Sequence, residues 1–264
     1  MRSRTWPVPA ILAVLLTGCA NGAAEPVPPP PDAAFDYQLG GAYEPAAGVE
    51  IVVRDRTTSP HPDLYSVCYV NAFQTQPGDE AAWPETALLT DGSGVRIVDP
   101  DWPDEVLLDI ADPEGAAVVV DRIGGWVHGC AADGFDAVEF DNLDSFTRSN
   151  GALSQEDAVA VAKELVDIAH ASGLAAAQKN AAEHALALRD DAGFDFAVAE
   201  ECAAYGECTA YTDVYATVLD IEYTDNLPES FEVLCARPGT PRAAIVRDRD
   251  LTRPGDSAYV RGTC

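Results

Sequence analysis

Short apolar runs that end on carboxylates constrain this 264-residue chain more than any other feature of its sequence. One run lies within 133–144 and reaches Asp141, and two others end on Glu200 and Glu222. Acidic residues are disfavoured in strands, so their recurrence at strand ends calls for another reason. Parallel strands with polar groups at their carboxyl ends are typical of the active face of an α/β barrel.

Side-chain alternation within 137–141 predicts two carboxylates on one face of a strand. Glu139 and Asp141 would project together, with Val138 and Phe140 on the opposite face. Crowding of like charge raises the pKa of at least one such carboxyl group and supplies a proton donor near neutral pH. The alternative is an ordinary turn, because Asp and Asn in the order Asp-Asn-x-Asp bond their own backbone.

Length and element order predict an α/β fold with a single (β/α)8 TIM-type barrel. Removal of a leader over 1–18 leaves 246 residues, close to the ~250 of one such barrel. Asp141 would end the fourth strand and Glu200 the sixth, and alternate strands contribute to one layer, so both would face one cleft. We expect the strands at 35–39, 49–54, 66–72, 137–141, 174–179, 195–200, 217–222 and 243–247.

Two helices are predicted between these strands. The clearer one spans 154–172, where Ser154 and Asp157 have the spacing of a capping box and apolar residues recur at helical intervals. Another is expected near 115–131. The segment 74–112 is irregular and rich in proline, which indicates an excursion over the active face.

The amino-terminal residues predict export. Arg2 and Arg4 precede an apolar run that is far shorter than the ~20 residues of a membrane span. Small residues before Cys19 resemble a lipoprotein cleavage site. We therefore expect a lipoprotein signal peptide over 1–18, a lipid-anchored Pro/Ala-rich tether over 19–34 and the barrel over 35–264. The protein would be a cell-envelope lipoprotein on the outer face of the membrane, or secreted if Cys19 is incidental.

The remaining six cysteines form an even set, which in an exported protein predicts three disulfides. Cys202 and Cys208 are close enough in sequence to close a short loop directly after Glu200. The other four are assigned as Cys68–Cys130 and Cys235–Cys264, although spacing alone leaves other pairings open. The four histidines show no ligand spacing beside the cysteines, so we expect no metal and no cofactor.

The net charge of −28 becomes −30 once Arg2 and Arg4 leave with the leader. Nucleic acid and anionic membrane surfaces are therefore poor partners, and contact with the membrane is expected through the lipid anchor only. Such a surface would steer a cationic substrate. Solubility outside the cell explains the same charge without any ligand.

Six ordered blocks of sequence resemble glycoside hydrolase family 114, the endo-α-1,4-polygalactosaminidases, over nearly the whole mature chain. The resemblance implies a (β/α)8 barrel that cleaves polymers of α-1,4-linked galactosamine, partly N-acetylated, with two carboxylates. The matching blocks are 35–39, 66–72, 133–144, 178–180, 194–208 and 222–223.

The resemblance places the first catalytic acid of the family on Asp141 and the second on Glu200. We expect Asp141 to be the nucleophile and Glu200 the acid/base. The family usually has Gln at the position of Glu201, Trp at that of Phe35 and Pro at that of Phe140. These departures concern substrate subsites more than the chemistry.

Further residues are candidates for substrate binding, because their aromatic rings could stack on sugars or their polar groups could form hydrogen bonds. Trp102 is an additional candidate for stacking. For each aromatic residue, ordinary packing is the alternative. Lys179 is one of only two lysines, which favours a role in the site. The predicted substrate-binding residues are Tyr37, Gln38, Asn142, Asp144, Lys179, Asn180, Glu201, Glu222 and Tyr223.

We expect a monomeric protein whose partner is a polysaccharide. Two functions other than hydrolysis remain open. One is a solute-binding lipoprotein of a transporter, although nothing in the sequence marks a hinge between two lobes. The other is a pseudoenzyme that holds an amino-sugar polymer without cutting it.

Overall fold

The computed structural model describes Met1 and residues 26–264. The predicted signal peptide, the lipidation site Cys19 and the first part of the tether lie outside the described residues. In the second part of the predicted tether, the carbonyl groups of Val27 and Pro29 accept hydrogen bonds from Tyr65 (2.7 Å) and Thr217 (2.9 Å). The packed part of the chain therefore begins before residue 35.

In the described part of the chain, nine strands form one curled sheet in chain order, and the first eight are parallel. The predicted (β/α)8 barrel and its eight strands are confirmed. The ninth strand, which pairs antiparallel with the eighth, was not predicted. The strands are β1 (Phe35–Tyr37), β2 (Ile51–Asp55), β3 (Tyr65–Asn71), β4 (Ala137–Asp141), β5 (Ala175–Lys179), β6 (Phe196–Glu200), β7 (Val218–Tyr223), β8 (Ala244–Arg247) and β9 (Arg261–Thr263).

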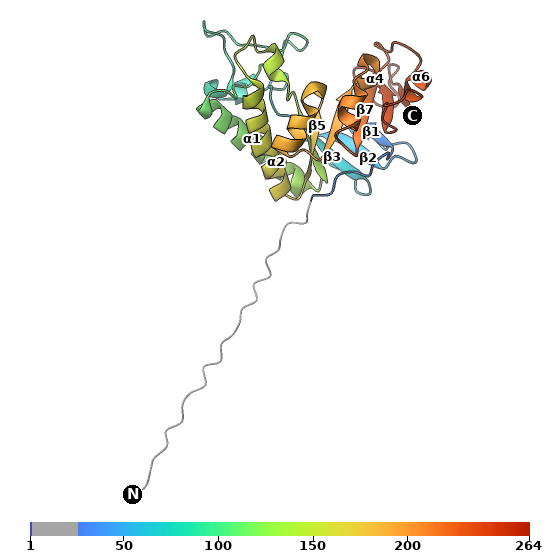
Figure 1. Cartoon of the computed structure of the whole chain (residues 1–264), viewed down its shortest axis with the longest axis horizontal. Coiled ribbons are helices and arrows are strands. Elements are labelled where there is room, and N and C mark those ends of the chain that lie inside the picture. The colour runs from blue at the N-terminus through green and yellow to red at the C-terminus, as the bar shows by residue number, and fades with distance from the viewer. Residues whose placement is uncertain (2–25) are drawn as a thin grey trace.

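Helices follow each strand from β3 to β7 and pack on the outer face of that part of the sheet, whereas among the described residues none follows β1 or β2. Figure 1 shows α1 (Pro113–Asp133) and α2 (Gln155–Ala171) side by side along one side of it. The predicted capping box of α2 is confirmed, because Ser154 and Asp157 exchange hydrogen bonds. The short helices are η1 (Glu80–Ala82), η2 (Glu85–Ala87), η3 (Ser145–Arg148), η4 (Ala182–His184), α3 (Ala185–Ala187), η5 (Leu188–Ala192), α4 (Cys202–Tyr205), α5 (Cys208–Thr212) and α6 (Phe231–Cys235). No described helix has the length and apolar character needed to cross a bilayer.

Alternation along each strand separates the barrel interior from the outer core. On β4, Val138 and Phe140 belong to the apolar core beneath the helices, whereas Ala137 belongs to the cluster inside the barrel. On β7, Leu219, Ile221 and Tyr223 point into the barrel. The interior below the active face is therefore packed with side chains, as in other barrels of this size.

Side chains, not a ladder of backbone bonds, join the two ends of the sheet. Arg247 on β8 is fully buried and donates hydrogen bonds to the carbonyl groups of Tyr37 and, at 2.8 Å, Thr252. Arg261 on β9 donates to the carbonyl oxygen of Phe35 at 2.9 Å. These two guanidinium groups hold β8 and β9 against β1.

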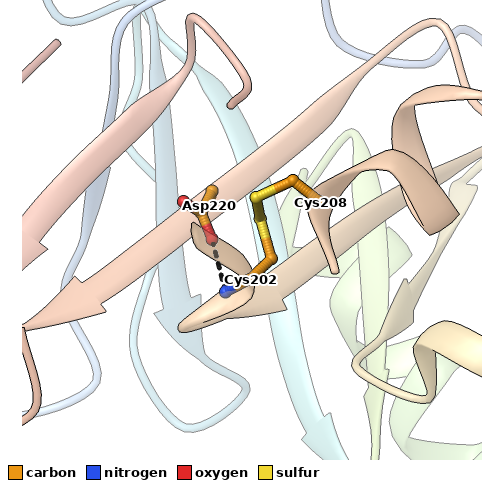
Figure 2. Close-up of side chains that lie close together, drawn as sticks. All are labelled: Cys202, Cys208 and Asp220. Atoms are coloured by element: carbon orange, nitrogen blue, oxygen red, sulfur yellow. Dashed lines mark hydrogen bonds between the residues drawn. A yellow bond between two sulfur atoms is a disulfide. The ribbon is translucent and has the colours of Figure 1, made fainter. Parts of the chain in front are cut away.

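All three predicted disulfides are present: Cys68–Cys130, Cys202–Cys208 and Cys235–Cys264. Figure 2 shows Cys202–Cys208 beside Asp220, whose carboxylate accepts a hydrogen bond of 3.3 Å from the backbone N–H of Cys202. These three residues are grouped closely enough to ligate an ion. Both sulfurs are used by the disulfide, however, so neither is available as a thiolate ligand.

Candidate active site

The carboxyl ends of the strands surround a cavity of about 350 Å³. Its floor is formed by residues at or directly after strand ends, including Asp141 and Glu200. Its wall is formed by part of the irregular segment 74–112, which confirms the predicted excursion over the active face. The wall residues are Asp99, Asp101, Trp102 and Glu105.

A single buried ammonium group lies at the centre of the site. Lys179, at the end of β5, is only 2% exposed, and its Nζ lies 3.6 Å from Asp141 Oδ2 and 3.3 Å from Glu200 Oε2. It also lies 3.4 Å from Glu139 Oε1 and donates to Tyr37 Oη at 3.1 Å. The carboxylates at the ends of β4 and β6 thus face each other across the cation of the strand between them.

Hydrogen bonds fix the orientation of Asp141. Its Oδ2 accepts a bond of 2.6 Å from the hydroxyl group of Tyr69, and its Oδ1 accepts one of 2.9 Å from the backbone N–H of Asn142. The Asn142 side chain in turn donates to Asn71 at 2.8 Å and accepts from Arg148 at 2.8 Å. The aspartate therefore has little freedom to rotate.

Glu200 is held in a comparable way. Tyr223 donates to its Oε1, and Asn180 donates to its Oε2 at 3.1 Å. The backbone N–H of Glu200 donates to the Asn180 side-chain oxygen at 2.8 Å, so two hydrogen bonds join Glu200 to Asn180. Its side chain is 26% exposed, compared with 15% for that of Asp141. Glu200 is therefore the more accessible of the two from the cavity.

Burial and neighbouring charges shift the pKa values of Glu200, Lys179 and Glu139 in opposite directions. Burial would raise the pKa of Glu200, but Lys179 and the hydrogen bonds from Tyr223 and Asn180 lower it below its ordinary value. Burial would lower the pKa of Lys179, yet the surrounding carboxylates hold it well above its usual range. For the fully buried Glu139, desolvation outweighs Lys179 and raises the pKa to about 7.

The chain turns sharply after each of these strands. Asn142, Asn180 and Glu201 directly follow β4, β5 and β6, and all three have positive φ values, of 64°, 53° and 61°. Asn tolerates this left-handed conformation well, whereas Glu does not. Glu201 is held there by a two-pronged ion pair with Arg249, at 2.8 and 3.1 Å. The turns carry the backbone away while the preceding side chain stays in the cavity.

The structure brings most of the predicted site residues together. Tyr37 lies buried beneath the cavity, where it donates to Glu139 at 2.7 Å, and Glu201 lies beside the cavity in its pair with Arg249. Those that line the cavity are Asp141, Glu200, Asn142, Asp144, Lys179, Asn180 and Tyr223.

Gln38 and Glu222 do not line the cavity, contrary to expectation. Each is adjacent in sequence to an inward-facing residue, and neighbouring residues of a strand point to opposite faces. Glu222 instead accepts hydrogen bonds from the backbone N–H groups of Ala203 (2.7 Å) and Ala204 (3.2 Å). Gln38 bonds to Arg54 at 3.0 Å. Both side chains support the barrel from outside.

Sequence reasoning missed Tyr69, Arg148 and Glu105 as members of the site. Alternation along 66–72 contained the signal for Tyr69, which lies two residues before Asn71 on the same face. Arg148 lies one helical turn after Asp144, to which it donates at 2.7 Å. No periodic pattern marked Glu105, because its segment has no regular structure.

Two carboxylates at the carboxyl ends of alternate barrel strands, facing one cavity, are typical of barrel glycoside hydrolases. The chain belongs to the glycoside-hydrolase family GH114, whose family model matches residues 17–264. No match was found among curated proteins.

Ega3 and PelA are among the solved structures that share the fold. A crystal structure of Ega3 from Aspergillus fumigatus in complex with galactosamine is 20% identical, covers 92% of this chain and 100% of its own, and has a TM-score of 0.74. The glycoside hydrolase domain of PelA from Pseudomonas aeruginosa is 14% identical, covers 86% of this chain and 97% of its own, and has a TM-score of 0.56.

Proposed function

We propose that the protein is an endo-acting hydrolase of α-1,4-linked galactosamine and N-acetylgalactosamine polymers. The observation that carries the proposal is the placement of Asp141 and Glu200 on either side of Lys179 in the cavity. Glycoside cleavage needs one carboxyl group to protonate the leaving oxygen and a second to attack or to activate water. The membership in GH114 supports the reaction class.

In the proposed mechanism Asp141 is the nucleophile. The bonds from Tyr69 and from the backbone of Asn142 orient its carboxylate for attack on the anomeric carbon. Glu200 protonates the leaving oxygen and then removes a proton from the water that hydrolyses the glycosyl intermediate. Lys179 stabilises the carboxylates throughout, and its positive charge limits the build-up of negative charge between them.

The lowered pKa of Glu200 means that the free protein holds this group ionised near neutral pH. Glu200 therefore acquires its proton when substrate displaces water from the cavity, since desolvation raises the pKa of a carboxyl group. The same lowered pKa favours a second candidate function, in which the protein binds the polymer without cleaving it.

The substrate class rests on three supports. The family resemblance implies galactosamine polymers, Ega3 shares the fold and was crystallised with galactosamine, and a net charge of −28 attracts cationic sugars. We further propose that the protein is exported, anchored through Cys19 and monomeric.

Incubation of purified protein with partly deacetylated polygalactosamine tests the proposal. Shortened oligomers are expected from the wild type and none from Asp141→Asn or Glu200→Gln, each with an unchanged melting temperature. A wild type that binds the polymer but releases no oligomers would establish the second candidate. A wild type that neither binds nor cleaves would contradict both.

A further inference from the structure

Most carboxylates that line the cavity are paired with a cation of the chain itself. Such pairing offsets the cost of placing negative charge in a partly desolvated site. The paired carboxylates are Asp141 and Glu200, which face Lys179, and Asp99 and Asp144, which face Arg148 at 2.6 and 2.7 Å.

Glu105 is different, because it lines the cavity but forms no ion pair with any residue in the described part of the chain. Its Oε2 accepts one hydrogen bond, of 2.9 Å, from Asn71, and its Oε1 has no partner among the described side chains. Burial raises the pKa of Glu105 to about 7, and the charges of Asp141 and Asp99 act in the same direction, while the bond from Asn71 and the charge of Arg148, which forms no ion pair with Glu105, offset only part of the rise. A cation from outside the chain would relieve this cost.

Asp101 also lines the cavity without a cation, but its side chain is exposed and water solvates its charge. Only the half-buried Glu105 therefore combines an unpaired carboxylate with desolvation. A chain of hydrogen bonds joins Glu105 to Asp141. Asn71 donates to Glu105 Oε2, the side chain of Asn142 donates to Asn71, and the backbone N–H of Asn142 donates to Asp141. The position of Glu105 is thus fixed relative to the proposed nucleophile.

An aromatic side chain accompanies this carboxylate. Trp102 lines the same cavity and is 58% exposed. The backbone N–H of Glu105 donates to the carbonyl oxygen of Trp102 at 2.9 Å, so one tight turn presents both side chains. An exposed indole face offers an apolar surface against which the C–H groups of a sugar ring pack.

We propose that Glu105 and Trp102 form a subsite for one protonated 2-amino sugar unit of the polymer. The carboxylate pairs with the ammonium group, and the indole packs against the ring. This inference rests on the proposed function and adds a determinant of acetylation preference, because an N-acetyl group carries no charge for Glu105 to bind. Asp141 and Glu200 then act on a neighbouring linkage. Glu105 selects a deacetylated sugar for the position next to that linkage.

The test measures binding of two probes by calorimetry in a Glu200→Gln background, which prevents cleavage. One probe is a fully deacetylated galactosamine oligosaccharide, and the other is the same oligosaccharide fully N-acetylated. Glu105→Gln keeps the shape of the side chain and its bond from Asn71. Asp104→Asn is the matched control, since it removes the same charge from the same segment at an exposed position outside the cavity.

Glu105→Gln is expected to weaken binding of the deacetylated probe at least about tenfold, because it removes one partner of a desolvated charge pair, and to leave the acetylated probe unchanged. Trp102→Ala is expected to weaken both probes. Asp104→Asn is expected to change neither. Equal loss for both probes in Glu105→Gln, or equal loss in Glu105→Gln and Asp104→Asn, would overturn the subsite.

The proposed function is judged separately, by the release of oligomers from the wild type. If the wild type cleaves the polymer and Glu105→Gln binds the deacetylated probe as tightly as the background does, the subsite is wrong while the function stands. Failure of the background to bind either probe, together with a wild type that releases no oligomers, would overturn both.

Discussion

Replacing Glu139 by Gln is expected to stabilise the protein at alkaline pH, although the residue lies at the base of the active site. Glu139 is fully buried, and its Oε2 has no hydrogen-bond partner. The charged groups that face it are Lys179, Asp141 and Glu200, together with the hydroxyl group of Tyr37. Desolvation outweighs the attraction of Lys179, so the pKa of Glu139 is about 7 in the folded protein.

The magnitude follows from linkage between proton binding and folding. An acid whose pKa rises from 4.5 to about 7 on folding stabilises the folded state below pH 4.5 and loses that contribution as the pH rises through 7. At about 1.4 kcal/mol for each pKa unit, the loss is about 3 kcal/mol. Gln resembles the protonated acid at every pH, so Glu139→Gln avoids the loss.

Urea unfolding of the wild type and Glu139→Gln at pH 5 and pH 8 measures the effect. The two proteins are expected to differ little at pH 5, while at pH 8 the variant is more stable by about 3 kcal/mol, or roughly 6–12 °C in melting temperature. Other titrating groups are common to both proteins and cancel in the difference. A variant that is less stable than the wild type at pH 8 would show that Glu139 is ionised throughout and acts as a counter-ion of Lys179.

Three further outcomes are expected. Lys179→Met should lower the free energy of unfolding by about 3–5 kcal/mol in urea titrations, because it leaves buried carboxylates unpaired; near-wild-type stability would show that water already screens them. Simultaneous replacement of Cys202 and Cys208 by Ala should lower stability by about 2 kcal/mol, the value expected for so short a loop, and calorimetric melting of the oxidised proteins checks this. Cleavage of a deacetylated polymer should slow as salt rises, since a Debye length of ~10 Å at 0.1 M screens steering, whereas cleavage of the acetylated polymer should not. Equal salt responses for the two polymers would assign the acidity of the chain to solubility.

Periodicity and composition predicted the parts of this structure that depend on local sequence. Alternation placed Glu139 and Asp141 on one face of β4, and both reach Lys179 in the structure. The same rule, applied to β1 and β7, would have excluded Gln38 and Glu222, since Tyr37 and Tyr223 occupy the inner face there. The signal lies in the parity of each strand, because a residue next to an inward-facing tyrosine points outward.

Other features depend on contacts between distant segments and had no local signal. The rarity of lysine marked Lys179 as a site residue, but its position between the carboxylates of two flanking strands follows only from the barrel. The strand β9 is three residues long with a central glycine, Gly262, and has no apolar pattern. The place of Glu105 in the cavity wall depends on how the irregular segment folds back over the strands.

The join between β1 and β8–β9 determines where the barrel is easiest to open. Arg247 and Arg261 hold this join through a few side-chain bonds, whereas every other pair of neighbouring strands shares a backbone ladder. Local unfolding begins where the fewest bonds must break, so amide protons at the outer edges of β1 and β9 should exchange with solvent first. Lys179 lies on β5, the middle strand of the nine, at the greatest distance in strand order from both edges. The barrel can therefore fray along its join while the strands that carry Asp141, Lys179 and Glu200 stay closed.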